Sequence, residues 1–246
     1  MFDFKGKRAL ITGATRGIGK AVATAFLASG ATVLGVYATN RKAADLFLNE
    51  CGPLASNLHL FQCDVADPKQ VQGLFEEIEE QFDTIDVLVN NAGIRKDGVV
   101  AMMPQEDWQR VIDVNLTGTF NMAKQAVLLM VKQKYGRIIN ITSPMAYMGF
   151  AGQANYAASK AGQIGMMRVL SKEVAKRKIT VNCVSPGFVD TEFLGDLTEE
   201  RALSYKKMIP MNRFGRPEEI AAGVLFLASE AAAYINGAVL EINGGL

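Results

Sequence analysis

Histidine and cysteine are scarce in this 246-residue chain, which contains one histidine and three cysteines. Cys51, Cys63 and Cys183 are odd in number, widely spaced and without a C-x-x-C pair, so we expect neither a disulfide framework nor a metal site. An excess of one charge is also lacking, because 26 Lys+Arg face 25 Asp+Glu. Such a balance gives no overall field for a polyanion, so no nucleic-acid partner is expected.

Long hydrophobic runs are absent as well. No stretch approaches the roughly 18 uninterrupted apolar residues of a membrane span, and the first eight residues carry charges where a signal peptide needs an apolar run. We therefore expect a cytoplasmic protein without membrane contact. With 49% apolar and 21% charged residues, the composition is typical of a soluble globular protein.

Short β-branched runs alternate with helical patterns along nearly the whole chain. Apolar residues three or four apart, such as Ile18, Val22 and Phe26, predict helices between the strands. Repeated strand–helix–strand units indicate a parallel sheet covered by helices on both faces. Without any linker, residues 1–246 are predicted to form one doubly wound α/β domain. Its seven strands are predicted at Arg8–Thr12, Thr32–Tyr37, Leu58–Cys63, Val87–Asn90, Arg137–Ile141, Thr180–Ser185 and Val239–Ile242.

The first predicted strand ends in a glycine-rich turn, TGATRGIG, and the next helix begins within it. Glycine lets the backbone turn sharply and approach a pyrophosphate, which the N–H groups of the helix N-terminus then bind. A P-loop is excluded, because Ala14 and Ala21 stand where it needs glycine and Ser or Thr. Glycine-rich turns also arise for steric reasons alone. The residues expected to bind a dinucleotide here are Gly13, Thr15, Arg16, Gly17, Ile18 and Gly19.

The end of the second predicted strand indicates which dinucleotide binds. It reads Tyr-Ala-Thr-Asn-Arg over residues 37–41 and contains no carboxylate to accept hydrogen bonds from a ribose 2′-hydroxyl. Arg16 and Arg41 are cations that could bind a 2′-phosphate. NADP(H) is therefore favoured over NAD(H). Alternatively, Arg41 is an ordinary surface residue in the first turn of the next helix.

Polar residues also follow the third and fourth predicted strands. In an open parallel sheet, ligands bind beyond the carboxyl ends of the strands. Asp64 and Asn91 can pair with an adenine edge or a ribose, while Val65, Ala92 and Gly93 offer backbone contacts. The alternative is turn chemistry, because Asp and Asn favour strand exits in any case.

Ser143, Tyr156 and Lys160 carry the predicted chemistry. Ser143 follows the fifth predicted strand, and a helix from about Asn155 places Tyr156 and Lys160 one turn apart on one face. A neighbouring ammonium lowers the pKa of a tyrosine, which makes it a usable acid toward a carbonyl oxygen. Ser143 could hydrogen-bond the same oxygen and orient the carbonyl. A Y-x-x-x-K pair alone is common on helix surfaces.

Together these motifs resemble the short-chain dehydrogenase/reductase family over essentially the full chain. The shared motifs are TGxxxGxG from Thr12, NNAG from Asn90, Asn115, Ser143, YxxxK from Tyr156, and Pro186-Gly187. The resemblance implies a Rossmann-type sheet, Tyr156 as acid/base, Ser143 as substrate-positioning group, and Lys160 also on the ribose. It further implies that Asn115 holds a water in a proton relay to Lys160. Further cofactor contacts are implied at Pro186, Gly187, Val189 and Thr191.

Within that family, residues 149–162 and 213–221 and the terminal Asn-Gly-Gly resemble 3-oxoacyl-[acyl-carrier-protein] reductases. That resemblance implies a homotetramer and NADPH-dependent reduction of a 3-oxoacyl thioester on acyl carrier protein, in fatty-acid or polyketide-like synthesis. Lys134 and Arg177 match the family's carrier-contacting arginines, and a basic patch near the pocket is expected from them. Cations at helix C-termini also complement the helix dipole without any partner.

Two features leave alternatives open. The segment Pro-Met-Ala-Tyr-Met at 144–148, together with Met102, Met103 and Phe188, suggests a wide apolar pocket, unless the methionines fill core gaps. The connection from Pro186 to about Met211 is long enough to be a lid, or two short surface helices. Other possible functions are reduction of acetoacetyl-CoA, oxidoreduction of another small carbonyl or alcohol, and a non-catalytic dinucleotide-binding module.

Overall fold

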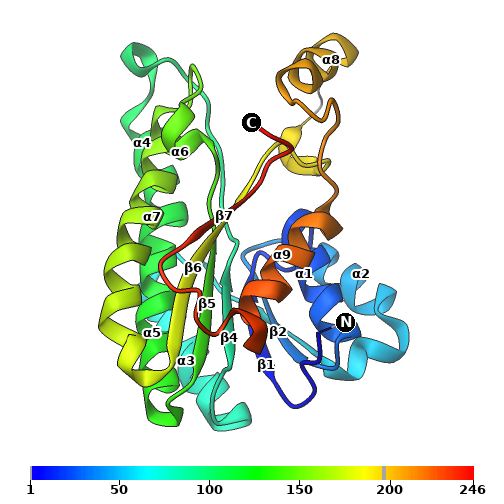
Figure 1. Ribbon diagram of the computed structural model, residues 1–246, viewed down its shortest axis with the longest axis vertical. Coiled ribbons are helices and arrows are strands. Elements are labelled where there is room, and N and C mark those ends of the chain that lie inside the picture. The colour runs from blue at the N-terminus through cyan, green and yellow to red at the C-terminus, as the bar shows by residue number, and fades with distance from the viewer. Residues whose placement is uncertain (1, 196–197) are drawn as a thin grey trace.

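A seven-stranded, all-parallel sheet forms the centre of the protein in the computed structural model, which describes residues 2–195 and 198–246 (Figure 1). The strand order is β3-β2-β1-β4-β5-β6-β7. Strand order reverses between β1 and β4, which are paired in the middle of the sheet. The strands are β1 (Arg8–Thr12), β2 (Thr32–Tyr37), β3 (Leu58–Gln62), β4 (Val87–Asn90), β5 (Gly136–Ile141), β6 (Ile179–Pro186) and β7 (Val239–Ile242).

The predicted strands are confirmed to within one residue at each end. Differences occur at the end of β3, at the start of β5 and at both ends of β6. Extended β-branched runs that are buried on both faces are typical of parallel sheets, and every residue of β5 and β6 is buried. The fold class predicted from the sequence is therefore confirmed.

Helices cover both faces of the sheet (Figure 1). On one side lie α1, α2 and α9, and on the other α3, α4, α5 and α7. The long helices are α1 (Gly17–Ala28), α2 (Arg41–Glu50), α3 (Pro68–Phe82), α4 (Gln105–Ile112), α5 (Gly118–Gln133), α7 (Ala154–Val174), α8 (Glu199–Met208) and α9 (Pro217–Ala228). Shorter helical segments are η1 (Gly52–Asn57), η2 (Val100–Met102), the π-helical η3 (Asp113–Thr117), α6 (Met145–Met148), η4 (Ala175–Arg177), η5 (Glu192–Leu194) and η6 (Glu230–Ala232).

Side-chain caps fix where α2 and α3 begin. The Asn40 side chain accepts a hydrogen bond from the backbone N–H of Ala43 at 3.0 Å, and Asp67 accepts from the N–H groups of Lys69 and Gln70. Such caps satisfy N–H groups that have no partner within the helix. Both helices therefore start directly after their capping residues.

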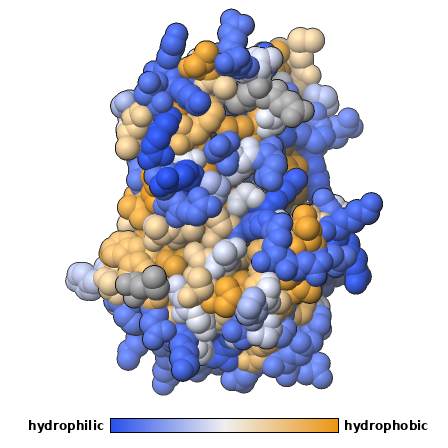
Figure 2. Space-filling view, turned by 90° about the vertical axis from the view of Figure 1, so that its right-hand side faces the viewer, coloured by the Kyte–Doolittle hydropathy of each residue, from blue (hydrophilic) through white to orange (hydrophobic). Residues whose placement is uncertain are grey.

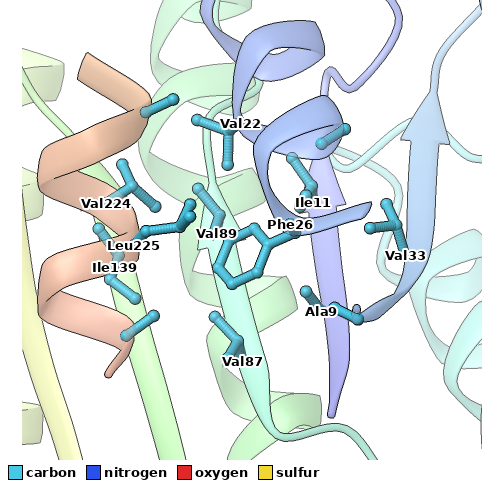
Figure 3. Close-up of a cluster of buried hydrophobic side chains, with 14 of the residues drawn as sticks. Ala9, Ile11, Val22, Phe26, Val33, Val87, Val89, Ile139, Val224 and Leu225 are labelled. Atoms are coloured by element: carbon cyan, nitrogen blue, oxygen red, sulfur yellow. The ribbon is translucent and has the colours of Figure 1, made fainter. Parts of the chain in front are cut away.

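The hydrophobic core has two layers, one on each face of the sheet. In the layer shown in Figure 3, Phe26 of α1 lies between β1 and β4, and Val224 and Leu225 of α9 pack beside it. The helix α1 thus packs on β1 and β2, α9 packs on β5, β6 and β7, and the two helices also contact each other. Figure 2 views the protein from this side and shows hydrophilic side chains over most of the rim, with hydrophobic ones gathered at the left.

The connection after β6 contains η5 and α8, which agrees with the alternative of two short surface helices; its residues 196–197 lie outside the described part of the chain. Among the described helices, none combines the length and the apolar character that a membrane crossing requires. Within the same described residues, no group of three or more His, Cys, Asp or Glu side chains could hold a metal ion.

Candidate active site

A cavity of about 700 Å³ opens at the carboxyl edge of the sheet. Its walls come from the segments that follow each of the first six strands, so it lies across the point where strand order reverses. Open α/β sheets bind their ligands at this place. A cavity of this size falls within the range of small-molecule and cofactor sites.

The glycine-rich turn forms the floor of the cavity. Gly13 and Gly17 have φ angles of +66° and +51°, which residues with a side chain rarely adopt. Gly19 does not line the cavity; a Cβ there would lie 2.1 Å from the carbonyl oxygen of Gly13. Gly19 thus lets α1 pack directly on the turn, and the N-terminus of α1 is aimed at the cavity as a phosphate site requires.

Asn91 ties the exits of β1 and β4 together. Its Nδ2 donates to the carbonyl oxygens of Thr12 and Gly13 at 2.9 and 3.2 Å. The Thr12 hydroxyl accepts hydrogen bonds from the N–H groups of Asn91 and Ala92, both at 2.9 Å. The two strand exits are therefore held at a fixed spacing, with the side-chain amide of Asn91 used for structure.

Asp64 lines the cavity and is held from two sides. One carboxylate oxygen accepts from the backbone N–H of Ala66 at 3.0 Å, and the other lies 2.9 Å from Nη2 of Arg110. Arg110 lines the cavity too, on α4. Arg110 could not be predicted as a partner of Asp64, because it is 46 positions away in the chain and lies on a different element.

The cavity beyond β2 contains the residues that the sequence assigned to the ribose. Tyr37, Ala38, Thr39 and Asn40 line it together with Arg16, whereas Arg41 does not. Arg41 is the exposed first residue of α2, which agrees with its alternative interpretation as helix surface. Of these two arginines, Arg16 is thus the one that lines the cavity.

Ser143 and Tyr156 meet at the other end of the cavity, and both side chains are buried. Their hydroxyl groups share a hydrogen bond, and the backbone N–H of Met145 donates to the Ser143 Oγ at 3.3 Å. Burial raises the pKa of Tyr156 to about 12, against lowering contributions from the Ser143 hydrogen bond and from Arg95. Two hydroxyls converge on one point from which either can donate to a ligand oxygen.

Lys160 lies one helical turn from Tyr156 on α7 and is fully buried. Its Nζ donates to the carbonyl oxygen of Ile141 at 2.7 Å and lies 5.6 Å from the centre of the Tyr156 ring. Burial lowers the pKa of Lys160 to about 8. The expectation that this ammonium lowers the pKa of Tyr156 is not met in this geometry, because desolvation dominates both groups and Lys160 is directed at the strand.

Asn115 is buried behind the cavity wall in the π-helical turn η3. Its Oδ1 accepts from the N–H of Ile94 at 2.8 Å, and its Nδ2 donates to the Ile94 carbonyl and to the Ser159 hydroxyl. A Cβ at Gly93 would lie 3.4 Å from Asn115 Oδ1 and 3.7 Å from Lys160 Nζ. The absence of a side chain at Gly93 thus keeps the space between these two groups open.

The remaining expected cofactor residues all line the cavity: Thr15, Ile18, Val65, Ala92, Pro186, Gly187, Val189 and Thr191. Gly187 also packs on the C-terminal segment, where a Cβ would lie 2.8 Å from the Cα of Asn243. Together with the glycine cradle and the helix N-terminus, these residues fit a nicotinamide dinucleotide laid across the carboxyl edge of the sheet.

Lys134 and Arg177 lie close together but far from the cavity. Each precedes its strand by two residues, and β5 and β6 start side by side with Gly136 paired to Ile179. They therefore lie at the amino edge of the sheet, whereas the cavity opens at the carboxyl edge. The expected basic patch near the pocket is wrong for a single chain, because a helix that leads into a parallel strand ends at the far edge.

The apolar wall differs in part from the expectation. Pro144, Met145 and Phe188 line the cavity, but Met102, Met103, Tyr147 and Met148 do not. Phe150 and Tyr205 line it instead, and the Tyr205 ring stacks on Phe188 at 4.9 Å. The polar side chains of Arg95 and Gln153 also line the cavity, and neither was predicted as a site residue from the sequence. The signal that could have found Arg95 is its place just beyond the NNAG motif.

Comparison with known proteins gives a consistent result. A family model described as enoyl-(acyl carrier protein) reductase matches residues 13–246. A 3-oxoacyl-[acyl-carrier-protein] reductase of Aquifex aeolicus is 44% identical over 245 residues, and the match covers 98% of each chain. The enzyme with that name from Escherichia coli is 43% identical over 244 residues, 99% of this chain and 98% of its own. One from Synechocystis is 47% identical over 239 residues, 97% and 96% of the two chains.

Proposed function

Because this chain belongs to the short-chain dehydrogenase/reductase family, we propose that it reduces a 3-oxoacyl thioester on acyl carrier protein to the 3-hydroxyacyl form with NADPH. The reaction serves fatty-acid or related polyketide-like synthesis. The three relatives compared above carry that activity in their names, and the matches span nearly the whole of each chain. The observation that carries the proposal is the pair of hydroxyls of Ser143 and Tyr156 at one end of a cavity that fits a dinucleotide.

The proposed chemistry assigns one task to each side chain. When bound, NADPH supplies the hydride for the carbonyl carbon. Ser143 and Tyr156 both donate hydrogen bonds to the ketone oxygen, which fixes its orientation and stabilises the charge that develops on it. Tyr156 then transfers its proton to that oxygen. Lys160 is assigned to the ribose hydroxyls, and its ammonium lies 5.6 Å from the centre of the Tyr156 ring.

We infer that the proton lost by Tyr156 is replaced through a water beside Gly93. The space there is flanked by Asn115 Oδ1 and Lys160 Nζ, which supply an acceptor and a donor. A water needs two to four polar partners and enough room to be held in this way. Asn115 is thus assigned to the relay, and it lies behind the wall rather than in the cavity.

The preference for NADPH over NADH rests on Arg16 and on the end of β2. No carboxylate lies among the residues of β2 that line the cavity, and Arg16 is exposed at the start of α1. A carboxylate there would repel a 2′-phosphate, while a guanidinium binds it.

A homotetramer is proposed as the assembly. Large apolar side chains, including Phe120 and Leu128 on α5 and Val169 on α7, are at least half exposed. Such exposed apolar residues indicate surfaces that another chain covers. Lys134 and Arg177 remain the proposed contacts for the carrier protein. Because they lie far from their own cavity, they would serve a cavity of a neighbouring subunit.

A substrate panel tests the proposed function. NADPH oxidation is measured with acetoacetyl groups on acyl carrier protein, on CoA and on N-acetylcysteamine, and with a crotonyl thioester. We expect turnover of the acetoacetyl thioesters, with the carrier-bound one preferred. Turnover of the crotonyl thioester alone would establish enoyl reduction, as in the description of the matching family model. Equal rates with the acetoacetyl group on acyl carrier protein, CoA and N-acetylcysteamine would contradict recognition of the carrier protein. A lack of turnover with every carbonyl compound would favour a non-catalytic dinucleotide-binding module.

A further inference from the structure

Three aromatic side chains form a connected part of the cavity lining. Phe150, Phe188 and Tyr205 all line the cavity, and each is half-buried. The rings of Phe188 and Tyr205 are nearly parallel, with their centres 4.9 Å apart and 12° between their planes. The rings of Tyr205 and Phe150 meet edge to face, at 6.0 Å and 79°. These three residues are called the aromatic wall below.

The aromatic wall joins three separate segments of the chain. Phe150 lies between α6 and α7, Phe188 follows β6 by two residues, and Tyr205 lies on α8. Phe214 does not line the cavity, but its ring lies 6.4 Å from that of Phe188 and 5.3 Å from Lys206 Nζ. Because aromatic pairs have preferred arrangements, these contacts hold the rings in a defined shape.

The aromatic wall begins beside the proposed proton donor. Phe150 packs on the small hydrophobic cluster that contains Met145 and Tyr156. A substrate whose ketone oxygen is bound at the Tyr156 hydroxyl therefore has the rings next to it. The thioester arm of such a substrate carries amides, which are costly to place against an apolar surface. The apolar acyl group is thus the part that suits the rings, together with the lining residues Pro144 and Leu194.

We propose that the aromatic wall binds the acyl group of the substrate and selects a planar one, aromatic or conjugated, over a saturated one. The inference rests on the proposed function, which places the ketone at Ser143 and Tyr156. A planar π-system can stack on one ring and meet another edge to face, and these contacts add to the burial of apolar area. A puckered saturated group of similar size gains the burial alone.

The rigidity of the rings is what permits this selection. Methionine side chains are flexible and adapt to many shapes, whereas an aromatic side chain has only two torsion angles and presents a flat surface. Met145 lines the cavity, but Met102, Met103 and Met148 do not. The adaptable pocket suggested by the methionines of the sequence is therefore replaced by one with a fixed aromatic side.

A matched pair of substrates tests the inference. The N-acetylcysteamine thioesters of 3-oxo-5-phenylpentanoate and 3-oxo-5-cyclohexylpentanoate have the same ketone and rings of similar size, but only the phenyl ring is planar. We expect kcat/KM with NADPH to be about three- to tenfold higher for the phenyl substrate. Tyr205→Leu and Phe188→Leu should each bring this ratio close to one, because leucine keeps an apolar contact without a ring.

Two further variants separate ring contacts from general damage. Tyr205→Phe retains the ring and should keep the ratio. Tyr234→Leu removes an aromatic side chain that is fully exposed and does not line the cavity, so it is the matched control. The ratio compares two substrates on one protein, so a smaller folded fraction in any variant cancels. A ratio near one in the wild type, or an unchanged ratio in both leucine variants of the wall, overturns the inference and leaves the rings as packing for α8.

Ligand binding distinguishes this inference from the proposed function. The 5-phenylpentanoyl and 5-cyclohexylpentanoyl thioesters of N-acetylcysteamine lack the 3-oxo group, so their binding to the NADP⁺ complex can be measured by calorimetry without turnover. A preference for the phenyl ligand that is lost in Tyr205→Leu supports the inference even if the substrate panel contradicts the proposed function. Equal affinities, together with turnover of the acetoacetyl thioesters, overturn the inference and leave the proposed function in place.

Discussion

The Nζ of Lys160 donates a hydrogen bond to the carbonyl oxygen of Ile141 at 2.7 Å. Ile141 is the last residue of β5 and stands two positions before Ser143, so this contact joins the helix of Tyr156 to the strand of Ser143. The bond places a cation in a buried position. Because a charge without water is costly, the same residue that orders the site also destabilises the folded protein.

Lys160→Met should stabilise the protein at neutral pH while abolishing its activity. Burial lowers the pKa of Lys160 from 10.5 to about 8. Between these pH values the unfolded chain binds a proton that the folded chain does not, so the free energy of unfolding of the wild type rises with pH there. Below pH 8 the folded wild type bears the full cost of burying the charged Lys160 side chain. This cost is on the order of 3 kcal/mol, without any contribution from changed packing in the variant.

Urea unfolding at pH 7 and at pH 10 measures this effect. The advantage of Lys160→Met should be large at pH 7 and mostly gone at pH 10. Lys172→Met, which changes an exposed lysine on the same helix, is the control. An advantage that stays constant with pH would mean that better packing, not the removed charge, causes it.

Tyr156→Phe should lower kcat by about 100-fold to 10,000-fold, the usual contribution of a general acid. Cofactor affinity should change little, since the phenyl ring still fills its place beside Met145 and Phe150. Stopped-flow measurement of hydride transfer and fluorescence titration with NADPH separate the two quantities. Tyr147→Phe is the control, because Tyr147 is nine positions away and does not line the cavity. Equal losses in both variants would contradict the acid role of Tyr156.

Arg16→Ala should weaken NADPH binding by about tenfold or more and leave NADH binding nearly unchanged. The lost contact is a charge-assisted hydrogen bond to a phosphate, which typically contributes about 1.5–3 kcal/mol. Ala38→Asp should act in the same direction, because its carboxylate would repel the 2′-phosphate at the end of β2. Arg41→Ala is the matched control. The measurement is the dissociation constant of each variant for NADPH and for NADH. An equal loss of affinity for both cofactors would show that Arg16 binds a group that NADPH and NADH have in common.

The fold could be predicted because local and global signals agree. In this chain the β-branched runs of β5 and β6 are buried on both faces, and Asn40 and Asp67 mark helix starts by side-chain caps that depend only on residues two or three positions away. The strand exits could be predicted as binding positions for a topological reason. In a parallel sheet all carboxyl ends meet at one edge, so Gly13, Asp64 and Asn91 had to come together.

The rest of the site depends on contacts between distant segments. Arg95 lies in the loop after β4 and Tyr205 lies on α8, and no sequence pattern states that their side chains point into the cavity. The pairing of Arg110 with Asp64 links α4 to the exit of β3 and has no local signal. The place of Lys134 and Arg177 is a different case. It could have been deduced, because a residue just before a parallel strand must lie at the amino edge.

Two glycine substitutions should have opposite effects on stability, because the two positions differ in what surrounds them. Gly73 is exposed in the middle of α3, with nothing within 4 Å of an added Cβ, so Gly73→Ala should stabilise the protein by about 0.5–1 kcal/mol. At Gly19 the added Cβ would lie 2.1 Å from the Gly13 carbonyl oxygen and 2.5 Å from Asn91 Nδ2. Gly19→Ala must therefore push α1 away from the turn. We expect the free energy of unfolding to fall by at least about 2 kcal/mol and dinucleotide binding to be lost. Thermal unfolding with and without NADPH measures both effects. A Gly19→Ala protein that unfolds at the wild-type temperature and still gains stability from NADPH would show that α1 does not need this close approach to form the phosphate site.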